Sequence, residues 1–390
     1  MSYRVIQWGT GNVGLASLKT VLGHPDYELV GCYVATPSKA GRDAGEIAGL
    51  APCGVRATND IGEILAMDAD VVLHMPLSAA QVNEDPDKDT KDICDLLRSG
   101  KNVITTVGYV YPKSYGIDIV ARLEEACRAG GSRLHGTGVN PGFMAELIPL
   151  VFSSHCSSIT SVLVREHSDF SFYPSPQIIF DVMGFSFEPE RYEAHTARYR
   201  KWLSGLFEES VLMIADGLGV ELDELTVESE VELATEDLTI AAGPVPRGTV
   251  AGQRWEWCGV AHGRDVVRLE AIYKAHKSVA PQWQSPAWVC SIEGEPRLHF
   301  EANKWTTNGL VGTAMRAVHA IPAVCAAPVG INASTPASAV NTGEDFDGAK
   351  MIHANATNHQ TALVTNSASS SKGASARGSN TSTPKATNAT

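Results

Sequence analysis

The sequence lacks the features of secreted, membrane-spanning, metal-binding and nucleic-acid-binding proteins. Its eight cysteines are scattered and none form a C-x-x-C pair, so neither a zinc site nor a disulfide framework is expected. The formal net charge is -13, whereas nucleic-acid binding needs a basic face. No uninterrupted apolar run approaches about 18 residues, and no charged and then apolar leader precedes the first strand. These absences predict a cytoplasmic protein with no metal and no nucleic-acid or membrane partner.

The chain has enough apolar material for a sizeable core. Hydrophobic residues make up 44% and charged residues 19% of its 390 residues, which is typical of a globular protein with two or three domains. Residues 1–155 alternate strand-like and helix-like segments, beginning with a strand at 3–9 and a helix at 14–24. This alternation predicts βαβ units. We therefore expect an α/β, Rossmann-type, doubly wound parallel sheet over residues 1–155.

The pattern changes in the second part of the chain. Residues 190–219 form a long amphipathic pattern typical of a helix, and 225–300 are rich in β-branched and aromatic residues broken by Gly and Pro. A last helix is expected over 309–324, ending near Pro322. We predict a second, α+β substrate domain over 156–328 whose sheet is mostly antiparallel.

The composition shifts again at the C-terminal end. Residues 329–390 are rich in Ser, Thr, Asn and Ala and contain very few large apolar side chains. Such a segment cannot bury enough apolar surface to offset the entropy lost on ordering. We therefore expect a disordered, low-complexity tail.

Three glycines lie where the first strand becomes a helix. Gly9-Thr10-Gly11-Asn12-Val13-Gly14 matches G-x-G-x-x-G. In this motif the first glycine permits a tight turn, the second lets a pyrophosphate approach the backbone, and the third allows close packing of helix on strand. Free N–H groups and the positive end of the helix dipole then face the pyrophosphate. The motif predicts that residues 9–14 bind a dinucleotide; a glycine-rich turn without a ligand is the alternative.

The loop after the second strand indicates which dinucleotide binds. In an NAD-selective site, an acidic residue at the end of this strand holds the ribose 2'-hydroxyl. Here the loop carries Ser38, Lys39 and Arg42, and no carboxylate occurs before Asp43. Hydroxyl and cationic side chains suit a 2'-phosphate. We predict that Ser38, Lys39 and Arg42 bind NADP in preference to NAD; otherwise Lys39 and Arg42 are ordinary solvated charges.

Four segments together resemble one enzyme family. They are VIQWGTGNVG (5–14), SKAGRDAGE (38–46), GKNVITT (100–106) and GTGVNPGF (136–143). They look like the dihydrodipicolinate reductase-like dehydrogenases, and within these like 2,4-diaminopentanoate dehydrogenase and the native NAD(P)H-dependent amine dehydrogenases. The resemblance implies a Rossmann domain and an α+β domain whose sheet takes part in a homodimer. It also implies hydride transfer between nicotinamide and a C=N, C–N or C=O carbon of a small-molecule substrate.

The resemblance implies further site residues. The family's Asn-Pro-Gly segment falls on Asn140, Pro141 and Gly142, which would lie near the nicotinamide. The backbone after the fourth strand falls on Met75 and Pro76, which would also contact the cofactor.

The chain departs from the family pattern in two places. Amine dehydrogenases of this family resemble one another in a glutamate just after the fifth strand, where this chain has Gly108 or Tyr109. Dihydrodipicolinate reductases resemble one another in a His-His-x-x-Lys arrangement, where residues 165–173 (REHSDFSFY) offer one histidine and no lysine.

The densest group of titratable side chains follows the expected domain junction. Hydride transfer needs a proton donor or acceptor near the reacting carbon. We predict His167, Tyr173 and Glu166 as catalytic residues: His167 or Tyr173 would protonate the product, and Glu166 would hold an iminium. Alternation along a strand puts Glu166 and Ser168 on one face and His167 and Asp169 on the other. An ordinary exposed strand end is the alternative.

Two tyrosines follow the fifth strand, at the end where doubly wound sheets bind ligands. Tyr109 and Tyr111 are therefore predicted to line the substrate pocket, with simple packing as the alternative. For the whole chain, an NAD(P)H-dependent oxidoreductase is the main hypothesis. A catalytically inactive NAD(P)-binding sensor or assembly protein is the alternative from another class. A sugar or inositol dehydrogenase would need Glu-Lys-Pro after GKNV, where this chain has ITT.

Overall fold

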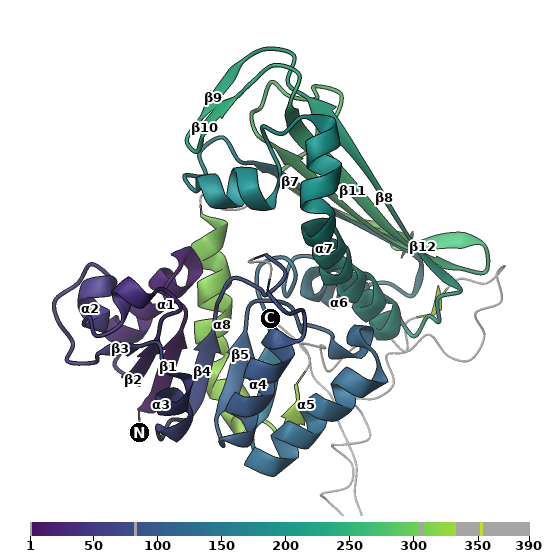
Figure 1. Cartoon of the computed structure of the whole chain (residues 1–390). Coiled ribbons are helices and arrows are strands. Elements are labelled where there is room, and N and C mark those ends of the chain that lie inside the picture. Colours follow the sequence, from purple (N-terminus) through teal and green to yellow (C-terminus); the bar gives the residue numbers. More distant parts are fainter. Residues whose placement is uncertain (1, 82–83, 304–307, 333–351, 354–390) are drawn as a thin grey trace, which may run out of the picture. The chain divides into compact units, whose positions relative to one another are not determined.

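A computed structural model describes residues 2–81, 84–303, 308–332 and 352–353 (Figure 1). Its first sheet is entirely parallel, in the order β15-β6-β5-β4-β1-β2-β3. The strands are β1 (Tyr3–Trp8), β2 (Tyr27–Tyr33), β3 (Ala57–Thr58), β4 (Val71–His74), β5 (Asn102–Thr105), β6 (Arg133–Gly136) and β15 (Gly330–Ile331). The strand order runs outward in both directions from β1 and β4, which confirms the predicted doubly wound Rossmann-type sheet.

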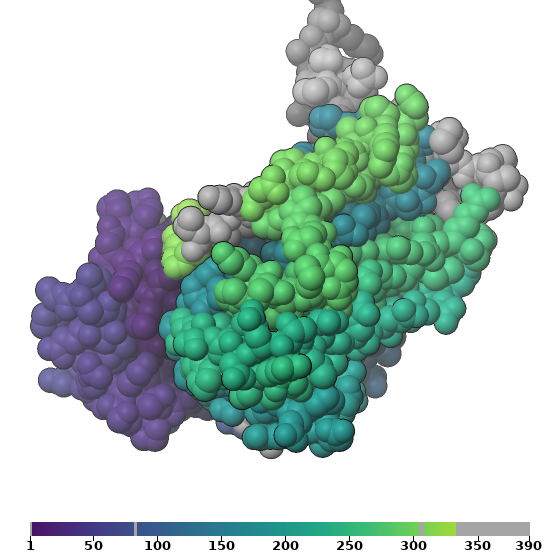
Figure 2. Space-filling view, turned by 90° about the horizontal axis from the view of Figure 1, so that it is seen from above, coloured from purple at the N-terminus to yellow at the C-terminus, as the bar shows by residue number. Residues whose placement is uncertain are grey.

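Helices cover both faces of this sheet. They are α1 (Asn12–Gly23), α2 (Ala44–Ile47), α3 (Ile61–Ala66), α4 (Lys88–Arg98), α5 (Ile117–Gly130) and α8 (Gly309–Ala326), with 3-10 turns η1 (Pro37–Lys39) and η2 (Pro112–Tyr115). Val5 and Leu73 face a core shared with α1 and α8, whereas Ile6 and Val72 face a core shared with α3, α4 and α5. The strands are apolar on both faces because both faces are covered. The N-terminal elements form one continuous lobe, the purple surface in Figure 2.

The second domain is built on a mixed sheet in the order β14-β13-β7-β12-β11-β8, with β16 (Ile352–His353) also paired to β7. The strands are β7 (Ser158–Asp169), β8 (Glu224–Leu233), β11 (Val250–Ala261), β12 (Arg264–Lys274), β13 (Trp288–Glu295) and β14 (Leu298–Ala302), beside a small hairpin of β9 (Leu238–Ile240) and β10 (Gly243–Val245). Most pairs are antiparallel, as predicted. β7 and β12 are parallel. A parallel pair needs a long connection, and here α7, β8 and β11 lie between the two strands in the chain.

The long helix α7 (Pro189–Leu218) packs on this sheet together with α6 (Leu147–Ser153). Leu203, Phe207, Val211 and Ile214 recur every three or four residues and are buried in the core of the second domain. This spacing lays one stripe of α7 against β11 and β12. A π-helical turn, η3 (Gln177–Val182), lies in the connection between β7 and α7.

The last helix, α8, differs from the sequence-based prediction in its position. Residues 309–328 were expected in the second domain, but Ala317, Val318 and Ile321 pack in the first domain's core beside α1. Figure 1 shows α8 running alongside α1 and β4. β15 then joins the edge of the same sheet by pairing with β6. The chain therefore returns to its first domain after the strands of the second domain up to β14.

Helix α8 also continues beyond the predicted end near Pro322, to Ala326. Proline has no N–H, so the carbonyl of Val318 loses its intrahelical partner. The hydroxyl of Tyr27 donates a hydrogen bond to that carbonyl at 3.2 Å. The helix continues because the carbonyl that Pro322 leaves free is satisfied from β2.

Two sequence-based expectations concern the C-terminal part of the chain. By length and composition, α8 is the one described helix that would be apolar enough to cross a membrane, with a mean hydropathy of 1.3. One face of α8 packs against α1 and the strands β4, β5 and β6, and 28% of the helix is buried. The predicted disordered tail began at residue 329, but Gly330–Ile331 form β15. Beyond residue 332, the tail lies outside the described residues apart from β16, and its disorder stays a prediction.

We predict that Tyr27→Phe destabilises the first domain. The change leaves the Val318 carbonyl without its partner, and such a bond contributes about 0.5–1.5 kcal/mol. The free energy of unfolding in urea should fall by about 1 kcal/mol. Tyr3→Phe is the control, because its ring packs 6.3 Å from that of Tyr27 while its hydroxyl has no hydrogen-bond partner among the described residues. Equal losses in the two variants would contradict the assignment.

Candidate active site

The glycine motif lies between β1 and α1, and each glycine meets a different constraint. Gly9 has φ +93°, and a Cβ there would lie 2.5 Å from the carbonyl oxygen of Met75. A Cβ on Gly14 would lie 2.1 Å from the carbonyl oxygen of Gly9. At Gly11 a Cβ would meet nothing within 4 Å. Gly9 and Gly14 thus serve the turn and the packing, while Gly11 borders open space.

The start of α1 is free to receive an anion. Gly11 is its N-cap residue, and no side chain accepts a hydrogen bond from the first turn. The first-turn N–H groups, with Thr10, Asn12 and Val13 around them, therefore face outward at the positive end of the helix. This uncapped helix start and the space beside Gly11 fit a dinucleotide pyrophosphate.

Two buried polar residues support the glycine loop, and sequence reasoning missed both. The Gln7 side-chain amide donates to the carbonyl of Gly9 at 3.0 Å, and the Ser17 hydroxyl donates to the Gln7 amide oxygen at 2.8 Å. Both side chains are fully buried. A glutamine inside an apolar strand was the available signal, since a buried amide needs partners.

The loop after β2 brings a cation to the glycine motif. Ser38 and Lys39 lie in η1, and the Lys39 ammonium donates to the Thr10 carbonyl at 3.0 Å and to its hydroxyl at 3.1 Å. Arg42 is exposed and has no ion-pair partner among the described residues. The structure thus joins Lys39 to the glycine loop, with Ser38 beside it in the same turn.

Asp43, the first carboxylate after β2, has a structural role. It caps α2, and its oxygens accept hydrogen bonds from the backbone N–H groups of Gly45, Glu46, Cys53 and Gly54. The hydrogen bond from Cys53 is the largest cause that lowers the pKa of Asp43 to about 2. Its carboxylate is therefore occupied by the loop itself.

The ends of β1 and β4 meet where the strand order reverses. The Met75 N–H donates to the Trp8 carbonyl at 2.8 Å, and the Met75 carbonyl packs against Gly9, with Pro76 following. His74 is fully buried and its Nδ1 lies 3.0 Å from the Thr105 hydroxyl. Burial lowers the pKa of His74 to about 3, so the imidazole is neutral. This is the edge where doubly wound sheets bind ligands.

The Asn140–Pro141–Gly142 segment joins the two domains at this edge. The Asn140 amide donates to a carboxylate oxygen of Glu166 on β7 at 2.6 Å. The amide oxygen of Asn140 is buried and has no partner among the described residues. The Gly142 N–H donates to Glu146 at 2.7 Å. The structure therefore brings together one residue inferred from the resemblance and one predicted catalytic residue.

Glu166 is half-buried on β7, and both of its carboxylate oxygens accept hydrogen bonds. Its second oxygen accepts from the Ser168 hydroxyl at 2.6 Å, which confirms that these two residues share a face. Burial raises the pKa of Glu166 above its ordinary range, although both hydrogen bonds oppose the shift. Burial, with a smaller contribution from the charge of Glu166, also raises the pKa values of Tyr199 and Tyr273.

Tyr199 and Tyr273 belong to the Glu166 site, and sequence reasoning missed them. Both side chains are buried, and neither hydroxyl has a hydrogen-bond partner among the described residues. Tyr199 comes from α7, and Tyr273 is the register partner of Ser168 on the parallel neighbour β12. Only the pairing of β7 with β12, which was not foreseen, indicates that Tyr273 lies here.

The structure separates the other two predicted catalytic residues. His167 lies on the opposite face of β7 from Glu166, as alternation predicts, and its Nδ1 is 3.0 Å from the Ser285 carbonyl. Tyr173 packs on Phe170 with ring centroids 6.0 Å apart, and Phe170 packs on Tyr273 at 5.6 Å. Tyr173 is thereby linked to the Glu166 site, whereas His167 is not.

Tyr109 and Tyr111, predicted to line a pocket, are both buried in hydrophobic cores. The Tyr109 hydroxyl pairs with that of Thr90 at 2.8 Å, and its ring stacks on Tyr115 at 4.8 Å. The backbone N–H of Tyr111 donates to Glu209 on α7 at 2.9 Å. Substrate contact by these two tyrosines stays a prediction.

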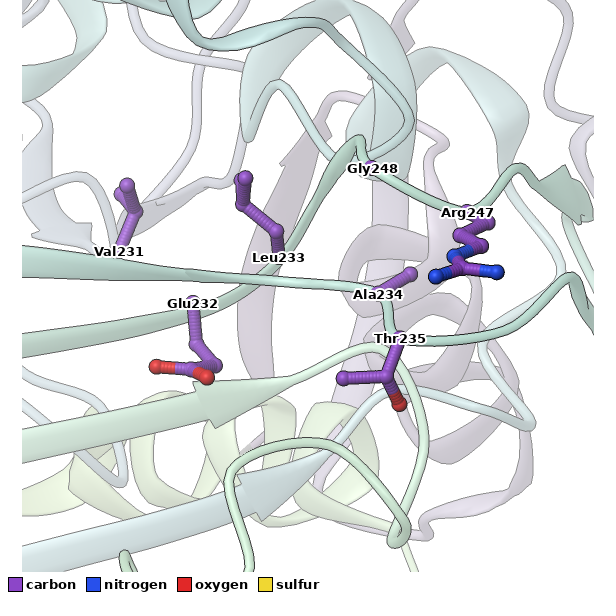
Figure 3. Close-up of a pocket in the computed structure, with 7 residues that line it drawn as sticks. All are labelled: Val231, Glu232, Leu233, Ala234, Thr235, Arg247 and Gly248. Carbon is purple, nitrogen blue, oxygen red and sulfur yellow. The ribbon is translucent and has the colours of Figure 1, made fainter.

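A hollow of about 430 Å³ lies elsewhere on the second domain (Figure 3). It is lined by Val231–Thr235 at the end of β8 and by Arg247 and Gly248 before β11. None of the predicted site residues lines it. Among the described residues no group of three or more His, Cys, Asp or Glu side chains is placed to hold a metal ion. The eight cysteines are free thiols.

Known proteins are similar to this chain in sequence and in fold. A model of the 2,4-diaminopentanoate dehydrogenase C-terminal domain matches residues 143–344. An amine dehydrogenase from Streptomyces virginiae is 32% identical over 307 residues, which cover 75% of this chain and 82% of that relative. A 2,4-diaminopentanoate dehydrogenase from Acetoanaerobium sticklandii is 25% identical over 238 residues, covering 59% of this chain and 65% of the relative.

A solved structure of an amine dehydrogenase from Mycobacterium smegmatis has the same fold. It superposes with a TM-score of 0.68 at 19% identity, covering 85% of this chain and 95% of the other.

We predict that Gly11→Val abolishes dinucleotide binding while the chain stays folded. The valine would occupy the open space beside the first turn of α1, so NAD(P)H affinity should fall by about a hundredfold or more, as when several charge-assisted hydrogen bonds are lost. Fluorescence titration with NAD(P)H and thermal unfolding measure the two effects. Gly14→Val is the contrasting variant: its Cβ would overlap the Gly9 carbonyl, so it should lower stability itself. A Gly11 variant that binds normally would show that the pyrophosphate lies elsewhere.

Proposed function

Because the chain belongs to the family of 2,4-diaminopentanoate dehydrogenase and the amine dehydrogenases, and is an NAD(P)-dependent oxidoreductase, we propose that it acts at the carbon of a C–N or C=N bond. The reaction interconverts a small primary amine and the corresponding imine, with the hydride passing to or from NAD(P), and the imine is hydrolysed by water to the carbonyl compound and ammonia or formed by the reverse condensation. The similarity to these dehydrogenases favours an enzyme over the alternative of an inactive sensor or assembly protein. A homodimer and a cytoplasmic location stay predictions.

The Asn140–Glu166 pair is the observation that carries this proposal. The Glu166 carboxylate and the unpartnered amide oxygen of Asn140 are hydrogen-bond acceptors. Asn140 lies in the segment that follows β6 at the carboxyl edge of the first sheet, and its amide bonds Glu166 there. Acceptors grouped in this way suit a ligand that donates N–H bonds and bears positive charge. An ammonium or iminium nitrogen has both properties, whereas a simple alcohol has one donor and no charge.

Glu166 is suited to move a proton as well as to hold one. A raised pKa brings a carboxyl group closer to the pH at which it exchanges protons with an amine. Its carboxylate takes the proton from the amine nitrogen in one direction and returns it in the other. The hydroxyls of Tyr199 and Tyr273, which have no partner among the described residues, complete the polar lining.

The chain's own residues account for binding of the cofactor. Residues 9–14 would hold the pyrophosphate, and Met75, Pro76 and Asn140–Gly142 would flank the nicotinamide side. When bound, the nicotinamide supplies or takes up the hydride. Lys39, Ser38 and Arg42 favour NADP over NAD, because Asp43 is already occupied by four backbone N–H groups.

We predict that Glu166→Gln lowers the rate of amine turnover about a hundredfold or more, as loss of a general acid–base group does. NADPH or NADH oxidation is followed with a panel of small ketones and aldehydes in ammonium buffer, and NAD(P)⁺ reduction with the matching amines. The affinity for NADPH should stay unchanged. His167→Gln is the comparison, since His167 faces the other side of β7. Loss in the His167 variant alone would transfer the role to His167, and no turnover of any amine or ketone by the parent would contradict the proposal.

We predict that Arg42→Ala and Lys39→Ala weaken NADP binding about tenfold to a hundredfold, because a hydrogen bond to a charged group contributes about 1.5–3 kcal/mol. NAD lacks the phosphate, so its dissociation constant should barely change. Arg42 gives the cleaner comparison, because Lys39 also bonds Thr10. Both constants are measured at one ionic strength. Equal losses of affinity for NADP and NAD, or no loss for either, would contradict the predicted preference for NADP.

A further inference from the structure

Two adjacent residues of α7 reach the backbone of two loops at the carboxyl edge of the first sheet. The Glu209 carboxylate accepts from the Tyr111 N–H at 2.9 Å and from the Tyr115 hydroxyl at 3.1 Å. The Ser210 hydroxyl donates to Glu146, whose other oxygen accepts from the Gly142 N–H at 2.7 Å. Glu209, Ser210 and Glu146 are all fully buried. The second domain thus holds the β5–η2 loop and the β6–α6 loop through neighbouring side chains.

The β5–η2 loop has a backbone conformation that calls for such a partner. Gly108 has φ +108° and Tyr109 has φ +59°, and a left-handed conformation is unfavourable for a tyrosine. The Tyr111 N–H that follows this turn is buried, so it needs an acceptor within the protein. The Glu209 carboxyl group accepts this hydrogen bond at 2.9 Å. Glu209 is therefore the internal acceptor of the β5–η2 loop.

The space beside Gly108 is filled by the same groups. A Cβ at Gly108 would lie 2.5 Å from the Tyr115 hydroxyl oxygen and 3.1 Å from a Glu209 carboxylate oxygen. A side chain at position 108 would therefore displace Tyr115 or Glu209. The loop conformation and the position of the α7 carboxylate consequently depend on each other.

The β5–η2 loop touches the segment that carries Asn140. A Cβ on Gly136, the last residue of β6, would lie 2.1 Å from the Tyr109 carbonyl oxygen and 2.5 Å from the Val110 nitrogen. The Tyr109–Val110 peptide therefore packs directly on the strand end from which the chain runs to Asn140. At the other end of that segment, Gly142 is held by Glu146 and Ser210.

We propose that Glu209 is a positioning residue of the reaction: by fixing the Tyr109–Tyr111 backbone it sets the β6 end of the Asn140 segment, while Ser210 and Glu146 set the other end. Asn140 then presents its amide to Glu166. The inference rests on the proposed function, since it assigns Asn140 and Glu166 to the amine site. A purely structural role explains the placement less well, because buried carboxyl groups usually stabilise a fold less than apolar side chains would.

The protonation of Glu209 offers a direct way to test this role. Burial raises its pKa from an ordinary 4.5 to about 8, and that of Glu146 to about 7. The titratable groups that face Glu209 are Tyr109, Tyr111, Tyr115 and Glu146, with the exposed Lys113–Asp216 pair one to two turns further along α7. Because the pKa is raised on folding, stability from this group is complete below about pH 4.5 and is lost as the pH rises through about 8.

The experiment compares Glu209→Ala with Glu209→Gln, and uses Glu208→Gln as the matched control. Glutamine reproduces the neutral acid, so the kcat of Glu209→Gln should equal that of the parent near pH 7. As the pH rises past about 8, the kcat of the parent should decline while that of the glutamine variant stays constant. Alanine should lower kcat about tenfold to a hundredfold, as misplacement of a reacting group does. The NADPH dissociation constant should change less than kcat in both variants, since residues 9–14, which would hold the pyrophosphate, lie outside this loop. Glu208 bonds Ser204 on α7 itself, so its variant should behave as the parent.

Amide hydrogen exchange tests the coupling without any substrate. Glu209→Ala should reduce protection of residues 106–115 and also of 137–146, and Ser210→Ala should reduce protection of 137–146. Unchanged protection of 137–146 in both variants would overturn the proposal, even if the parent turns over no amine and the proposed function fails. If the alanine variant does not fold, the glutamine variant decides: a decline with pH like that of the parent would contradict the inference. An unaltered kcat in a folded Glu209→Ala variant would also contradict the inference.

Discussion

The carboxyl edge of the parallel sheet, where loops of the first domain are bonded by side chains of the second, is the constraint that governs the rest of the structure. Parallel strands end at a common edge, where the loops carry backbone N–H groups that the ladder no longer pairs. These unpaired N–H groups find different partners after different strands. After β1 the N–H groups are left open beside Gly11, whereas after β5 and β6 they are bonded by Glu209 and Glu146. An open loop and two occupied loops therefore lie along the same edge.

Glu209, Glu146 and Glu166 differ in what donates hydrogen bonds to them, and this difference separates their roles. Glu209 and Glu146 each accept at least one backbone N–H, whose direction is fixed by the chain. Glu166 accepts from the side chains of Asn140 and Ser168, which are able to rotate. Glu166 can thus exchange a protein partner for a ligand without a change of backbone. A carboxylate held by backbone groups is suited to fix a loop, and one held by side chains is suited to meet a substrate.

The sequence predicts those parts of the site that are local in the chain. The glycine motif needs six consecutive residues, and the faces of Glu166 and His167 follow from alternation along one strand. Tyr199, Tyr273 and Glu209 carry no local signal, because they reach the site from α7 and β12. Tyr273 meets Ser168 through the parallel pairing of β7 with β12. The extent and position of α8 depend in the same way on Tyr27, 291 residues before the carbonyl that it bonds.

The return of α8 to the first sheet has a consequence for synthesis of the chain. Val5, Leu18 and Leu73 share their core with Val318 and Ile321, so the face that α1 covers lacks the rest of its cover until residues near 321 have been made. Domains usually fold from the N-terminus as they leave the ribosome. Here the second domain has all of its own strands from β7 to β14 before α8 exists. The core of the domain that is made first is therefore closed only after residues near 321 have been made, later than the strands β7 to β14 of the second domain.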